Sequence, residues 1–111
     1  MVKPEVRAYS SYSRNALQLL ARMIRRARID RKLTTQELAD RAGISRGLVQ
    51  RIERGDPGCA IGAVFETAAI VGVRLFDADQ PTMAAHLNAN STALALMPKT
   101  VRSSRKVKDD F

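Results

Sequence analysis

Residues 34–55 read TTQELADRAGISRGLVQRIERG, and this stretch decides the fold. Thr34 and Glu37 have the spacing of a capping box, in which a hydroxyl and a carboxylate bond the free amides at the start of a helix. Gly43 suits the left-handed conformation that ends a helix, and Ser45 can cap the helix that follows. The pattern predicts two short helices joined by a tight turn.

Apolar residues in this stretch would bring both helices against one core. Two helices that cross steeply must approach closely, and the small side chain of Ala39 permits this. Ile44, Val49 and Ile52 are expected to point inward. The other face of the second helix is then left for solvent or a ligand. Its residues are polar or small: Ser45, Arg46, Gly47, Gln50, Arg51 and Arg54.

Helical periodicity extends to both sides of the stretch. Apolar residues between Leu17 and Ala27 recur at helical spacing and predict a helix from Arg14 to about Arg31 or Lys32. A later helix is expected to end at Gly72, with an apolar face made of Ile61, Val64, Phe65, Ala68 and Val71. Leu75 and Phe76 are expected to fold back on the core.

A fifth helix is predicted from Asp79, with Pro81 in its first turn, through about Asn90. Residues 94–97 are short and apolar, and they fit either the end of this helix or a strand near residues 94–101. The predicted fold class is therefore all-α with five helices, a possible short C-terminal strand and a flexible tail.

The charge is distributed unevenly over the 111 residues, whose net charge is +8. Residues 1–55 hold 13 basic and 5 acidic residues, residues 56–98 hold 1 and 4, and residues 99–111 hold 5 and 2. A basic surface favours a polyanionic partner, because contacts with phosphates release counterions. An anionic membrane is the alternative, but the helix over residues 14–31 lacks the Trp and Phe of a membrane-surface helix.

Catalytic and metal-binding patterns are not found. His86 is the single histidine and Cys59 the single cysteine, and a surface imidazole and a half-buried thiol are the simplest interpretations. Asp77 and Asp79 suit helix capping better than a metal pair. We therefore expect no enzyme activity, cofactor or metal. The lone cysteine and the absence of a signal-peptide pattern predict a cytoplasmic protein.

The central stretch resembles the Xre/Cro-type helix-turn-helix family of phage repressors and bacterial regulators. The resemblance covers about residues 17–75. It rests on R-x-x-R-x-L-T at 28–34, E-L-A at 37–39, A-G-I-S at 42–45 and I-E-R-G at 52–55. It implies a five-helix lambda-repressor-like domain whose second motif helix lies in the major groove of DNA. An αα-hairpin that serves only for packing is the alternative.

The resemblance also implies roles for individual residues. The base-reading positions would be Ser45, Arg46, Gly47, Gln50 and Arg51. The phosphate-contacting positions would be Thr35, Gln36 and Arg54. Arg28 and Glu53 would form a structural ion pair between the first helix and the recognition helix. Gly47 departs from the pattern, since relatives often carry a long polar side chain there.

Further features resemble HipB-like antitoxins, which are encoded beside HipA-type kinase toxins. They are SYSRNALQLLARMIRRAR at 11–28, G-D-P at 55–57, V-G-V-x-L-F-D-A-D at 71–79 and the tail pattern L-x-x-x-P-K-x-V-R at 94–102 with D-D-F at the end. This likeness implies a repressor of its own operon with a HipA-like Ser/Thr kinase toxin as partner. A stand-alone autorepressor without a toxin is the alternative.

The predicted organisation has four parts. Residues 1–13 form a flexible arm and residues 14–78 the DNA-binding domain. Residues 79–98 form a dimerisation helix and segment, with Met83, Leu87, Leu94 and Leu96 as apolar contacts. Residues 99–111 form a basic tail. It would bind a partner, contact DNA non-specifically or only add charge that keeps the protein soluble. A homodimer on palindromic double-stranded operator DNA is expected, because one recognition helix contacts too few base pairs for genomic specificity.

Overall fold

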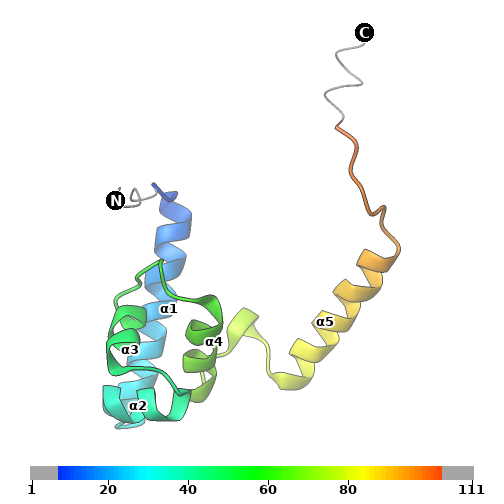
Figure 1. Ribbon diagram of the computed structural model, residues 1–111. Helices are drawn as coiled ribbons and strands as arrows, with labels where there is room; N and C mark the ends of the chain where they lie inside the picture. The colour runs from blue at the N-terminus through cyan, green and yellow to red at the C-terminus, as the bar shows by residue number, and fades with distance from the viewer. Residues whose placement is uncertain (1–7, 104–111) are drawn as a thin grey trace. The chain divides into compact units, whose positions relative to one another are not determined.

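The computed structural model describes residues 8–103, and all regular secondary structure in them is helical (Figure 1). The elements are α1 (Ser11–Asp30), α2 (Thr35–Ala42), α3 (Arg46–Glu53), α4 (Ile61–Ile70), the short 3-10 turn η1 (Leu75–Asp77) and α5 (Gln80–Ala95). The chain divides into two compact units after Asp77. The all-α fold class predicted from the sequence is confirmed.

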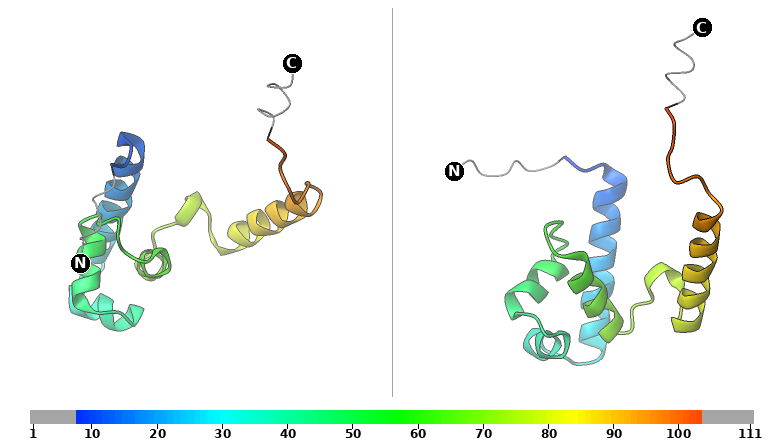
Figure 2. Two further views of the ribbon diagram at one scale, coloured as in Figure 1. Left: turned by 45° about the horizontal axis from the view of Figure 1, so that its top comes forward. Right: turned by 45° about the vertical axis from the view of Figure 1, so that its right-hand side comes forward.

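The core of the first unit lies where α2 packs against α3 and α4, and where α1 packs against α3 (Figure 2). Each helix contributes apolar side chains at helical spacing, which is how amphipathic helices share one core. Ala39 is completely buried between helices, as a close approach requires. The buried cluster consists of Ile24, Leu33, Leu38, Ala39, Val49, Ile52, Ala68 and Val71.

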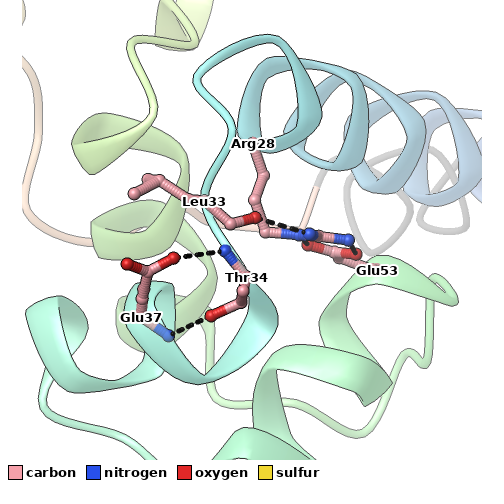
Figure 3. Close-up of polar contacts among 5 residues, drawn as sticks. All are labelled: Arg28, Leu33, Thr34, Glu37 and Glu53. Carbon is pink, nitrogen blue, oxygen red and sulfur yellow. Dashed lines mark hydrogen bonds and ion pairs between the residues drawn. The ribbon is translucent and has the colours of Figure 1, made fainter.

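The motif itself forms by local chemistry, as predicted. Thr34 Oγ1 accepts the amide of Glu37 at 3.0 Å, and Glu37 Oε1 accepts the amide of Thr34 at 2.8 Å (Figure 3). These two bonds hold the pKa of Glu37 below its usual value. Gly43 has φ +68°, and Ser45 Oγ accepts the amide of Leu48 at 3.1 Å. The capping box, the turn and the second cap together set where α2 and α3 begin and end.

The first helix starts earlier than predicted. Ser10 Oγ accepts the amide of Ser13 at 3.2 Å, so the helix begins at Ser11 instead of Arg14. Residues 11–13 are therefore helical and do not belong to an arm. Residues 1–7 of the predicted arm lie outside the described residues.

Two expectations around α4 are wrong. Ile61 is 69% exposed, because it is the first residue of the helix and lies beyond the core; Thr67 is buried instead, with its hydroxyl bonded to the carbonyl of Ala63. Phe76, with φ +54°, is not part of the buried core and is 77% exposed, although its ring contacts Phe65 of α4 edge-on with ring centroids 6.2 Å apart. Leu75 does pack against the core.

The second unit contains α5, which starts as predicted, with Asp79 Oδ1 accepting the amide of Thr82. The helix continues to Ala95 and not only to Asn90. It thereby takes up part of the apolar segment over 94–97, and residues 94–103 contain no strand. Over residues 8–103, no helix has the length and hydropathy needed to cross a membrane.

Candidate nucleic-acid interface

Helix α3 buries one side and exposes the other. Val49 and Ile52 are buried in the core. At about 100° per residue, positions 47, 50, 51 and 54 then lie on the opposite side. The exposed residues of this side and of the helix start are Arg46, Gly47, Gln50, Arg51 and Arg54. A helix that presents arginine and glutamine from a fixed frame suits hydrogen bonding to base edges.

An ion pair fixes α3 to α1 (Figure 3). Arg28 Nε donates to Glu53 Oε2 at 2.6 Å and Nη2 donates to Oε1 at 3.0 Å, so the pair is bidentate. Nη1 of the same guanidinium donates to the carbonyl of Leu33 at 2.8 Å. Only 13% of the Arg28 side chain and 6% of the Glu53 side chain are exposed. The hydrogen bond to Glu53 raises the pKa of Arg28 despite this burial. Both residues therefore hold α3 in a fixed position relative to α1.

A polar cleft of about 340 Å³ lies beside this pair. Its lining brings together three of the predicted contact residues, Thr35, Gln50 and Arg54, with Arg25 of α1. Glu53 neutralises Arg28 at the cleft, so Arg25 and Arg54 are the cations left to face an anion. The start of α2 adds free backbone amides near Thr35, which favour a phosphate. For Arg25 the sequence left two interpretations open, a phosphate contact and a solvated position on a helix face.

Ser45 and Gln36, two further predicted contact residues, make hydrogen bonds within the protein. Ser45 caps α3, so its oxygen already accepts one hydrogen bond. Gln36 Nε2 donates to Asp40 Oδ1 at 2.9 Å on the same helix. A Cβ at Gly47 would meet nothing nearer than Ser45 Oγ at 3.9 Å. The backbone of α3 is thus bare at Gly47, and a close approach of the helix to DNA meets no side chain there.

The end of α3 is held by the first helix. Gln18 Nε2 donates to the carbonyl of Arg54 at 3.1 Å. Gly55 follows with φ +77°, and a Cβ there would lie only 2.4 Å from Gln18 Nε2. Glycine is therefore favoured here by the backbone conformation, and a larger residue would also have to displace the end of the Gln18 side chain.

Arg51 has a neighbour that sequence reasoning missed. Its Nε donates to Asp56 Oδ2 at 2.9 Å, and the two side chains are 44% and 35% exposed. A spacing of five residues is not a helical pairing, and it arises here because the chain turns at Gly55. The G-D-P pattern at 55–57 contributed to the family likeness but did not reveal this contact.

Cys59 and His86 are the single cysteine and the single histidine of the chain. The Cys59 thiol is half-buried against the core, and burial raises its pKa. His86 lies exposed on α5. Within the part of the chain that the structure describes, no group of three His, Cys, Asp or Glu residues could hold a metal ion.

Comparisons with known proteins agree with this geometry. A family model described as a helix-turn-helix domain matches residues 19–85, which is more than half of the 111 residues. No match was found among curated proteins or solved structures. The matched region contains the capping box, the turn, α3 and the ion pair behind it. The chain therefore belongs to the helix-turn-helix domain family.

Proposed function

We propose that the chain is a transcriptional repressor that binds a palindromic operator in a sequence-specific manner as a homodimer. The observation that carries the proposal is the exposed side of α3, which presents Arg46, Gln50 and Arg51. The Arg28–Glu53 pair fixes this helix to α1. In this proposal Arg46, Gln50 and Arg51 contact bases, Ser45 and Gly47 allow close approach, and phosphates bind at Thr35, Gln36 and Arg54. The net charge of +8 supports attraction to DNA.

Dimerisation through α5 is supported by the composition and exposure of this helix. Residues 80–98 contain no Asp, Glu, Lys or Arg. No residue of α5 is buried, and Leu87 and Leu94 are each 67% exposed. Met83, Leu87 and Leu94 recur at spacings of four and seven residues, so they share one side of the helix. Most helical stability in proteins comes from packing against another surface, and depletion of charge is typical of interface cores.

Arginine contacts with bases and with phosphates are distinguishable by mutation. Arg46→Ala is expected to weaken binding to a selected duplex by about 1–3 kcal/mol and to change binding to random DNA little. Arg54→Ala is the matched control, because loss of a phosphate contact weakens both DNAs and reduces the slope of log K against log salt by about one. Affinities measured by fluorescence anisotropy at several salt concentrations give both quantities. Equal losses on both DNAs for Arg46→Ala would remove it from the base-reading residues.

An antitoxin role with a HipA-like Ser/Thr kinase as partner is the more specific form of the proposal. It rests on the likeness at residues 11–28, 55–57, 71–79 and 94–102 to HipB-like antitoxins. A stand-alone autorepressor is the alternative. A cytoplasmic location fits either form, and the free thiol of Cys59 is compatible with a reducing compartment.

Affinity capture from the native host separates these two forms. We expect tagged full-length chain to recover a kinase-like protein and a chain truncated after Pro98 to lose it, because the basic tail would supply the binding peptide. Recovery by both would place the binding surface in the helical units. Recovery of no protein, with DNA binding intact, would identify a stand-alone repressor.

A further inference from the structure

Asp56 makes two hydrogen bonds immediately beyond the recognition helix. Its Oδ2 accepts from Nε of Arg51 at 2.9 Å, and its Oδ1 accepts the backbone amide of Gly58 at 2.8 Å. The bond from Gly58 and the bond from Arg51 together hold the pKa of Asp56 below its ordinary value. The carboxylate is therefore ionised at neutral pH and anchored to the backbone of the turn.

Glycine at position 58 leaves open space beside this pair. A Cβ at Gly58 would lie 3.2 Å from Asp56 Oδ1 and 3.5 Å from Arg51 Nη2. The first distance is shorter than a comfortable contact, so a side chain here would press on the carboxylate. Gly58, Asp56 and Arg51 thus form one arrangement at the C-terminal end of α3.

We propose that Asp56 is a positioning residue that holds the guanidinium of Arg51 in the orientation needed to recognise guanine. The bond to Asp56 uses Nε, while Nη1 and Nη2 stay available to donate to O6 and N7 of guanine in the major groove. An unrestrained arginine has many rotamers, and fixing it in advance lowers the cost of ordering it on DNA. This inference rests on the proposed function, since it assigns a support to one of the base contacts.

The negative charge of Asp56 has a second effect. A carboxylate near the DNA surface repels phosphates, so the pair reduces the attraction of Arg51 to any DNA. Specificity is a difference of affinities, and a group that weakens the wrong complex increases it. Asp56 is expected to improve discrimination between sequences more than it improves affinity.

Double-mutant titration of the full chain tests the proposal. The probes are the duplex that the wild-type chain selects from a randomised library and an unselected duplex of equal length. Asp56→Asn is expected to lower the preference for the selected duplex about 10-fold, as part of a base contact worth about 5- to 150-fold. In an Arg51→Ala background the same substitution is expected to change the preference by less than about 2-fold, because the positioned group is gone.

Controls separate positioning from charge and from folding. Glu66→Gln removes one negative charge from an exposed position of α4, and this control is expected to leave the preference for the selected duplex unchanged. Asp56→Asn is expected to keep the wild-type melting temperature, because the pair is partly exposed. An unchanged or stronger preference in Asp56→Asn overturns the proposal, as does an equal loss in both backgrounds. Full preference in Arg51→Ala also overturns it but leaves the proposed function standing, whereas a wild-type chain that selects no sequence overturns both.

Discussion

Replacing Glu53 with alanine is expected to lower the free energy of unfolding by about 3–5 kcal/mol. The substitution leaves the Arg28 guanidinium, 13% exposed, without the carboxylate that accepts two of its hydrogen bonds. A domain of this size has a total stability of only about 5–10 kcal/mol, so the variant would be close to unfolding at body temperature. Chemical denaturation followed by circular dichroism measures the loss.

A double variant shows whether the loss comes from the stranded charge. Replacing Arg28 with methionine and Glu53 with leucine removes both charges and keeps apolar volume, and it is expected to cost far less than Glu53→Ala alone. The partly exposed Arg51–Asp56 pair is the comparison, and Arg51→Ala is expected to change stability by at most about 1 kcal/mol. A double variant as unstable as the single one would contradict this account of the Arg28–Glu53 pair.

Replacing both Leu87 and Leu94 with glutamate is expected to convert the proposed dimer to a monomer. Both leucines are exposed on α5 and lie on the same side of it. Two charges placed in an apolar seam cannot be hydrated once the seam closes. Because a dimer binds its second half-site at high effective concentration, the monomer should bind a palindromic duplex about 10²–10⁴-fold more weakly. Light scattering after size exclusion gives the mass, and DNA titration gives the affinity.

Thr92→Glu is the matched control for the double variant. Thr92 lies on the opposite side of α5 at about 100° per residue, so the added charge would stay in water. This control is expected to remain dimeric and to keep its affinity. A double variant that stays dimeric would exclude α5 as the dimer seam.

Features set by neighbouring residues were predictable from the sequence. The capping box at Thr34 and Glu37, the turn at Gly43 and the cap at Ser45 depend on contacts within three or four residues. The burial of Val49 and Ile52 follows from helical spacing. Because these contacts join residues that are close in the sequence, the sequence predicted the two motif helices correctly.

Features that depend on distant contacts or on the path of a turn were not predictable in this way. The Arg28–Glu53 pair links positions 25 residues apart, and only the family likeness suggested it. The Arg51–Asp56 contact needs the turn at Gly55 to bring the side chains together. Phe76 was assigned to the core from its hydrophobicity, although it is 77% exposed and contacts Phe65 only with its ring edge-on.

The start of α1 and the end of α5 differ from the prediction, because both helices extend beyond the apolar residues whose spacing predicted them. Ser10 caps α1 seven residues before Leu17, where the apolar pattern begins. At the other end, Asn90 and Ser91 bond back to the carbonyls of His86 and Leu87, so α5 passes Asn90 without interruption. Residues 90–92 are polar and add no apolar periodicity, so the sequence pattern did not extend the predicted helix over them.

The central claim is that α3 recognises a DNA sequence, and selection from a randomised duplex library tests it most directly. The full-length chain should enrich one palindrome whose half-sites are spaced by about one helical turn, roughly 10 base pairs. The Arg46→Ala chain should enrich a sequence relaxed at one position in each half-site. Uniform retention of all duplexes by the wild-type chain, with affinity set by salt alone, would contradict the claim.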